Sequence, residues 1–154
     1  MRKGYTLIEI LVTLTIIGLL FSFGFAGFRD FSRRQEVVGA GRKVIGDLRL
    51  AQQKSLSGEK PSGCTGSLST YDFKRVDASS YQIVAVCSGG SVIDKTQNLP
   101  SGLSISSFSP NPISFKILGR GTNVPVGTNT AITLTQTGTA NTTAITINSG
   151  GEIK

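Results

Sequence analysis

A long apolar segment near the start of the chain constrains this sequence more than any other feature. From Leu7 to Phe28 the only ionisable side chain is Glu9. A helix of that length would measure about 33 Å, which is enough to cross the apolar core of a bilayer. A charge at the centre of a membrane helix costs about 2.5–3.5 kcal/mol on insertion scales, and less near the ends. The carboxylate therefore predicts a function that requires a cationic partner.

A short basic leader precedes this segment. Residues 1–4 read Met-Arg-Lys-Gly, Tyr5 follows, and residues 6–9 read Thr-Leu-Ile-Glu. The arrangement resembles the class III signal of type IV pilins and pseudopilins. The resemblance implies that prepilin peptidase cuts between Gly4 and Tyr5 and methylates the new N-terminus at Tyr5. It also implies that Glu9 sets subunit assembly by pairing with the Tyr5 amine of a neighbouring chain, which would offset the cost of the charge.

Other membrane signals share part of this pattern. Arg2 and Lys3 followed by an apolar run would also fit a plain signal anchor or a cleaved secretory signal. The run is too long for a secretory signal, and its end at residues 25–28 (Phe-Ala-Gly-Phe) is a poor cleavage site. A single-pass membrane protein without a filament role remains an alternative, and it would keep the leader intact.

Beyond the apolar run, the helical period continues on one face only. From residue 29 to 55, apolar residues recur three or four positions apart, which predicts an amphipathic helix. The residues in this stripe are Phe31, Val37, Val38, Val44, Ile45, Leu48 and Ala51. We expect four parts: a leader at 1–4, a transmembrane and assembly helix at 5–28, an amphipathic continuation at 29–55, and a globular head at 56–154.

The head has the pattern of strands. A turn cluster at 57–63 ends the helix, and alternation at 71–76 and 81–87 predicts a hairpin. Further strands are expected within 91–99, 102–108, 113–118, 131–136 and 143–148. The fold class is therefore α+β: one long N-terminal helix packed on an antiparallel β-sheet.

This layout resembles the H-type minor pseudopilins of type II secretion and the FimT-like minor pilins. The matching stretches are residues 47–52 at the helix end, Ile-Ser-Phe at 113–115, and Gly-Arg at 119–120. The resemblance implies a subunit anchored in the cytoplasmic membrane with an extracytoplasmic head. Its partners would be prepilin peptidase, other subunits through the N-terminal helix, and membrane lipid before assembly.

Two cysteines are present, Cys64 and Cys87. If the head lies outside the cytoplasm, they are most simply one disulfide; in a cytosolic protein they would be free thiols. A bridge closing that loop would contribute about 3.4 kcal/mol in the chain-entropy account.

Nothing in the sequence supports an enzyme, a metal site or a cofactor. The chain has no histidine, which removes the usual catalytic triads and the commonest metal ligand. Its net charge of +7, or +5 without Arg2 and Lys3, suggests an alternative function as a DNA-binding minor pilin of an uptake pilus. The candidate contacts are Lys74, Arg75, Lys116 and Arg120. DNA-binding FimT-like proteins carry Gly-Arg-x-Arg at the C-terminus, whereas residues 151–154 read Gly-Glu-Ile-Lys, which puts that route in doubt.

Overall fold

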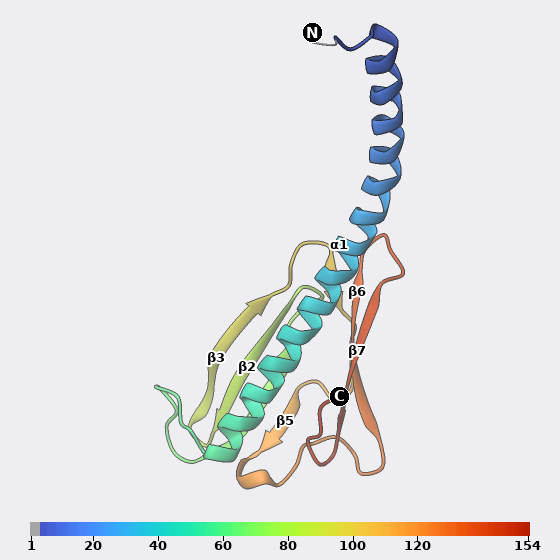
Figure 1. Cartoon of the computed structure of the whole chain (residues 1–154). Helices are drawn as coiled ribbons and strands as arrows, with labels where there is room; N and C mark the ends of the chain where they lie inside the picture. Colours follow the sequence, from blue (N-terminus) through green and yellow to red (C-terminus); the bar gives the residue numbers. More distant parts are fainter. Residues whose placement is uncertain (1–3) are drawn as a thin grey trace. The chain divides into compact units, whose positions relative to one another are not determined.

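In the part of the chain that the structure describes, one α-helix, seven strands and one short 3₁₀ helix follow one another, with the helix first and the strands after it as expected. The computed structural model describes residues 4–154, apart from the side chains of 23–27. Residues 1–3, which belong to the expected leader, lie outside the described part. The chain forms two compact units, the first ending at Glu36 and the second comprising Val37–Lys154. The elements are labelled in Figure 1.

The helix α1 runs from Leu7 to Ser57. It ends two residues beyond the expected boundary because Gly58, not Ser57, stops it. Gly58 adopts φ +65°, and the next amide, that of Glu59, donates to the Lys54 carbonyl at 3.1 Å. This is the Schellman arrangement, in which a glycine in the left-handed region closes the last turn.

The strands of the second unit form two antiparallel sheets rather than one. The first has the order β3-β2-β1-β5 and the second β4-β6-β7. The strands are β1 (Leu68–Arg75), β2 (Ser80–Cys87), β3 (Gly90–Asn98), β4 (Leu103–Ile105), β5 (Ile113–Lys116), β6 (Asn129–Gln136) and β7 (Thr142–Asn148). A short 3₁₀ helix, η1 (Ile117–Gly119), follows β5. The predicted hairpin is confirmed, because β1 pairs antiparallel with β2.

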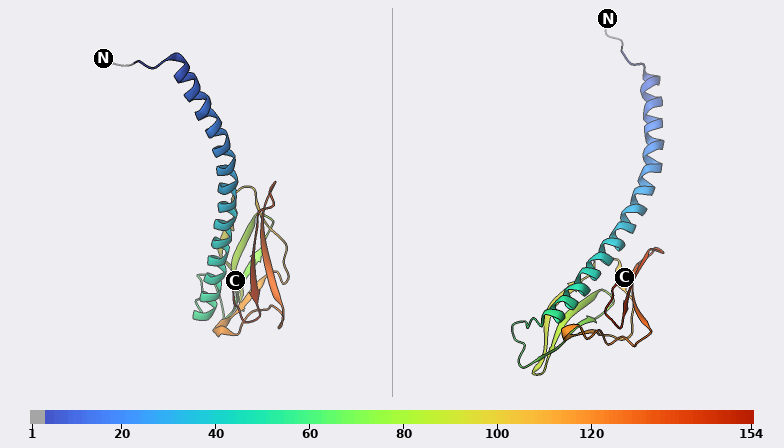
Figure 2. Two further views of the ribbon diagram at one scale, coloured as in Figure 1. Left: turned by 45° about the vertical axis from the view of Figure 1, so that its right-hand side comes forward. Right: turned by 60° about the horizontal axis from the view of Figure 1, so that its bottom comes forward.

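Alternation along the strands places the apolar side chains in a core shared with the helix. Ile132 and Leu134 of β6 and Ile145 and Ile147 of β7 are fully buried, while the intervening threonines are more exposed. Within the second unit, the C-terminal part of α1 lies against the sheets (Figure 2). Its buried stripe consists of Val37, Ala40, Val44, Leu48 and Ala51.

Two members of the expected stripe, Phe31 and Val38, do not belong to the core. Phe31 is 60% exposed and lies in the first unit. The three- and four-residue spacing of apolar residues extends to the N-terminal side of Val37, but the buried part of the stripe begins at Val37. At the packed end, Gly41 matters, because a Cβ there would lie 2.9 Å from Thr143 Cγ2 of β7. The glycine lets the helix approach that strand closely.

Candidate functional site

The bond between Gly4 and Tyr5 lies in exposed, non-helical chain. Gly4, Tyr5 and Thr6 precede the helix, and Tyr5 is 80% exposed. A peptidase needs a scissile bond that is not held in a helical hydrogen-bond ladder. The backbone at the expected cleavage position meets that requirement.

Thr6 caps the helix immediately after this bond. The Glu9 amide donates to Thr6 Oγ1 at 3.3 Å, and the amides of Glu9 and Ile10 donate to the Thr6 carbonyl. Thr-Leu-Ile-Glu thus has the spacing of a capping box, in which a threonine cap meets the amide of a glutamate three residues later. A carboxylate in the first turn also interacts favourably with the helix dipole. The motif therefore fixes where the helix begins as well as carrying the charge.

The two threonines within this segment are satisfied within the helix. Thr13 Oγ1 donates to the Ile10 carbonyl at 2.9 Å, and Thr15 Oγ1 donates to the Val12 carbonyl at 2.8 Å. Such back-bonding lets a hydroxyl sit in apolar surroundings. Among the described residues, no cation forms an ion pair with the Glu9 carboxylate. The described residues therefore supply no cation for the Glu9 carboxylate.

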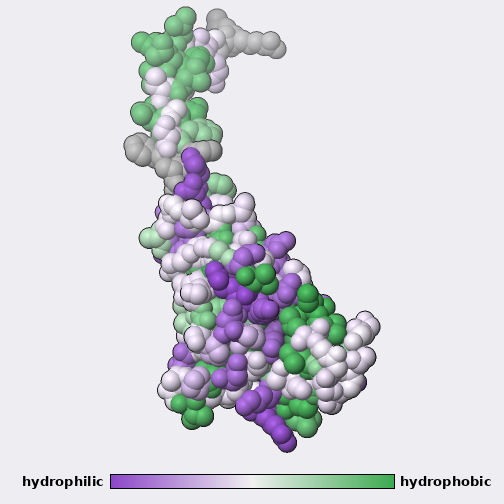
Figure 3. Space-filling view, turned by 180° about the vertical axis from the view of Figure 1, so that it is seen from behind, coloured by the Kyte–Doolittle hydropathy of each residue, from purple (hydrophilic) through white to green (hydrophobic). Residues whose placement is uncertain are grey.

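The described first part of the helix, residues 7–22, has an apolar and uncovered surface. Leu7 is 84% exposed, Ile8 71% and Phe21 72%, and Figure 3 shows apolar surface over the described first turns of α1. An apolar patch of this extent marks a surface that another molecule or a lipid phase covers. In the described parts of the helix, residues 7–22 and 28–57, no stretch is both long enough and apolar enough to cross a membrane.

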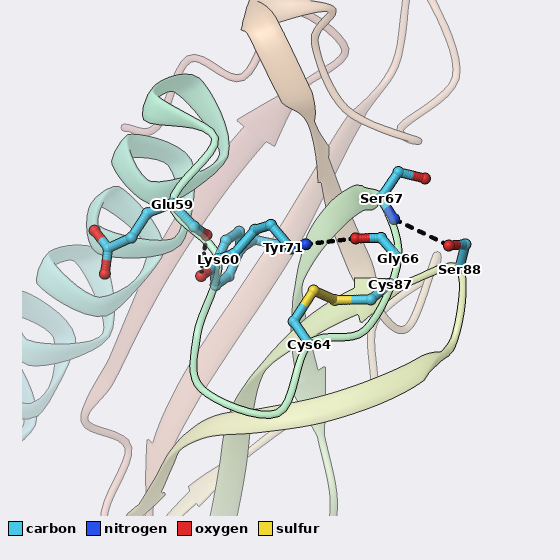
Figure 4. The surroundings of a disulfide bond; sticks show 8 residues. All are labelled: Glu59, Lys60, Cys64, Gly66, Ser67, Tyr71, Cys87 and Ser88. Atoms are coloured by element: carbon cyan, nitrogen blue, oxygen red, sulfur yellow. Dashed lines mark hydrogen bonds between the residues drawn. A yellow bond between two sulfur atoms is a disulfide. The ribbon is translucent and has the colours of Figure 1, made fainter.

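Cys64 and Cys87 form a disulfide. The bridge joins the loop after α1 to the end of β2 (Figure 4). The same loop is held by Tyr71, whose hydroxyl donates to the Glu59 carbonyl at 2.8 Å, and by the Ser67 amide, which donates to Ser88 Oγ at 3.0 Å. A disulfide and two hydrogen bonds therefore hold the loop that connects the helix to the sheet.

The four basic candidates are not brought together. Lys116 lies opposite Thr70 at one end of β1, about 14 Å along the strand from Lys74. Arg75 is half-buried and donates from Nε to the Ile105 carbonyl at 3.0 Å, so it has a structural partner. Lys116 and Arg120 line one groove, and Lys116 lies at the end of β1 that is away from Lys74 and Arg75. The aromatic rings near these cations, Phe73 and Phe115, are buried.

A buried polar cluster was not identified from the sequence. Asp47 of α1 accepts a hydrogen bond from the Tyr81 hydroxyl at 2.7 Å and pairs with Lys95 Nζ at 2.6 Å. The Asp47 side chain is 7% exposed. About two turns further along the helix, the Lys54 ammonium group pairs with the Asp94 carboxylate at 2.9 Å. The signal was available, because Asp47 is an acid within the apolar stripe between Val44 and Ala51.

These contacts shift the pKa values of the cluster. Burial, followed by the hydrogen bond and the charge of Asp47, raises the pKa of Tyr81 far above its ordinary value. Burial opposes the charged form of Lys54, but its hydrogen bonds to Asp94 and Glu59 prevail and raise its pKa. Both shifts favour the protonated forms, which are those that bridge helix and sheet.

Comparison with known proteins adds one result at the N-terminus. Residues 1–25 match the family described as the prokaryotic N-terminal methylation motif. No curated protein and no solved structure matches the chain. Together with the α+β fold, the motif supports a type IV pilin-like protein. More particularly, it is the motif of a prepilin, which implies processing by prepilin peptidase, a membrane-anchored precursor and assembly with other pilin subunits.

Proposed function

We propose that this chain is a structural subunit, a minor pilin or pseudopilin, of a type IV pilus or a type II secretion-type filament. The observation that carries the proposal is the N-terminal segment itself. An accessible Gly4–Tyr5 bond is followed by the apolar segment 7–28, whose one carboxylate, on Glu9, has no cationic partner among the described residues.

The chemistry of processing supplies the missing partner. Cleavage after Gly4 creates an amine on Tyr5, and methylation leaves that amine basic and cationic. Within one chain, the first turn of the helix lies between the Tyr5 amine and the Glu9 carboxylate. In that turn the Glu9 amide already donates its hydrogen bond to Thr6 Oγ1. In a bundle of identical helices, the amine of one chain meets the carboxylate of another. An ion pair in low dielectric favours that register over others.

The exposed apolar side chains of the helix suit both environments of such a subunit, the membrane before assembly and the filament after it. Before assembly, the exposed side chains of residues 7–22 are covered by membrane lipid; in the filament they are covered by the same segment of other subunits. The head contributes a separately packed unit, with all members of its main core lying between Val37 and Ile147.

Mass spectrometry of the protein isolated from its membrane tests this proposal directly. The expected mature chain begins at Tyr5 and carries a methyl group on its amine. A matched control replaces Gly4 with Val, which blocks the cut and retains residues 1–4. A wild-type protein with an intact leader, or one that begins elsewhere, would contradict the proposal.

A further inference from the structure

An open groove lies at the end of the head where β5, η1 and the C-terminal turn meet. Its volume is about 600 Å³, and a smaller pocket of about 150 Å³ adjoins it. The two share Lys116, Gly119, Gly121 and Gly150 as lining residues. Nothing in the assembly role of the N-terminal helix uses this surface.

The floor of the groove is rigidly built. The Thr122 amide donates to the Ser149 carbonyl at 2.8 Å, and the Lys116 amide donates to the Gly121 carbonyl at 2.9 Å. A Cβ at Gly121, which has φ +79°, would overlap the Ser149 carbonyl oxygen, so this close approach requires glycine. From the helix side, Gln52 Nε2 donates to the Gly151 carbonyl at 2.9 Å. A surface held in this way binds without first having to be ordered.

The charge of the groove is uncompensated. Lys116 and Arg120 line it, and no aspartate or glutamate does. Within residues 4–154, neither cation forms an ion pair or a side-chain hydrogen bond, whereas Lys54 and Lys95 both have carboxylate partners. Two cations that line one groove and have no partner there attract a carboxylate or a phosphate.

Exposed apolar side chains occur in and next to the segments that line the groove and the smaller pocket. Val126, which lines the groove, is 91% exposed, and Leu56, which lines the smaller pocket, is 51% exposed. Leu118, between lining residues in sequence, is 72% exposed. Leu118 also has φ +58°, the one positive φ outside glycine in the described chain. Residues held in such sparsely populated backbone conformations cluster at active sites and ligand-binding sites.

We propose that this groove docks a protein partner through an extended acidic segment in which carboxylates alternate with apolar side chains. The carboxylates would pair with Lys116 and Arg120, and the apolar side chains would cover Leu118 and Val126. A protein segment fits better than a nucleic acid because no aromatic ring is available for base stacking: Phe115, the ring at the groove, is 2% exposed. The inference does not depend on the filament role.

The test measures the fluorescence anisotropy of two short labelled peptides with the full-length protein in detergent. One peptide alternates leucine and aspartate, and the other alternates leucine and asparagine. The acidic peptide is expected to bind and the neutral one to bind at least about tenfold more weakly, with the difference shrinking as salt is added. Equal binding of the two peptides, or no binding of the acidic one, would overturn the proposal.

Variants assign the binding to the groove. The double variant Lys116→Ser, Arg120→Ser is expected to lose about tenfold or more in affinity. Its matched control, Lys74→Ser with Arg49→Ser, removes the same charge from exposed positions outside the groove and should bind as the wild type does. Equal losses in the two double variants would show a bulk charge effect and refute the site.

Two further measurements separate binding from stability and from nucleic acid. Leu118→Gly removes the apolar side chain and relieves the positive φ, so it is expected to weaken peptide binding severalfold while raising the melting temperature. Weaker binding accompanied by a lower melting temperature would instead indicate a structural role. Oligothymidylate is titrated in the same assay, and tight binding of it through Lys116 and Arg120 without peptide binding would overturn the choice of partner.

Discussion

Two acids on one helix have opposite surroundings. Asp47, in the second unit, is buried and meets both Tyr81 and Lys95 of its own chain. Glu9, in the first unit, is exposed, and no described cation of its own chain pairs with it. The first acid fixes the helix on its own sheet. The second lies among exposed apolar side chains, and we propose that its counterpart is supplied by another subunit.

We expect the largest effect from removing the exposed acid, Glu9. Glu9→Val should reduce filament assembly by at least about tenfold, because the charge that selects register is lost. The stability of the head should not change, since Glu9 is not a member of the head's core. Subunits in sheared filaments and in membranes can be compared by immunoblot. The matched control is Thr13→Val, whose hydroxyl bonds only within its own helix.

Normal filament yield from the Glu9→Val protein would show that the carboxylate does not direct assembly. A loss of membrane insertion in the same variant would show that the defect arises earlier than assembly.

Removing the buried acid should have the reverse effect. Asp47→Ala leaves Lys95 and the Tyr81 hydroxyl without their partner, and the free energy of unfolding of the head should fall by about 4 kcal/mol. Denaturant unfolding followed by circular dichroism measures the loss. Asp30→Ala, an exposed acid of the first unit, is the control and should leave the head unchanged. A loss below 1 kcal/mol for Asp47→Ala would mean that the cluster does not hold helix and sheet together.

The smallest expected effect comes from Tyr81, and it depends on pH. Tyr81→Phe removes the hydroxyl that donates to Asp47 and should cost about 2 kcal/mol at neutral pH. In the wild type the pKa of Tyr81 is higher in the folded state than in the unfolded state. Its contribution is therefore complete below about pH 10 and is lost as the pH rises further, because only the unfolded chain releases the proton readily.

The difference in stability between wild type and Tyr81→Phe should accordingly narrow above pH 10. Chemical denaturation at a series of pH values gives that difference. A gap that stays constant to high pH would show that burial and Asp47 do not hold the tyrosine in its protonated form.

Much of the architecture follows from local patterns. Alternation places the strands, and the three- and four-residue spacing places the buried stripe of α1. The division into two sheets does not follow, because it depends on which strands pair. The segment that contains Pro110 and Pro112 carries the chain from β4 in one sheet to β5 in the other. Proline lacks the amide that a sheet ladder needs, so this segment separates the strands instead of pairing them.

The candidate site was predictable to a different degree in each region. The N-terminal motif is read from contiguous residues, so Gly4, Tyr5 and Glu9 are found without the fold. Asp47 and Lys95 are 48 positions apart, and their pairing depends on how the helix lies on the sheet. The positive φ of Leu118 could not be predicted from the sequence, because leucine does not favour that conformation.

The most direct test of the account is the distance between the Tyr5 amine and the Glu9 carboxylate in assembled filaments. Filaments are built from a mixture of two subunit preparations, one labelled with ¹⁵N and the other with ¹³C, and solid-state NMR detects contacts between them. The account predicts a cross-peak between the methylated amine of one chain and the carboxylate carbon of another. Its absence in well-ordered filaments, with other helix–helix cross-peaks present, would contradict the assembly role of Glu9.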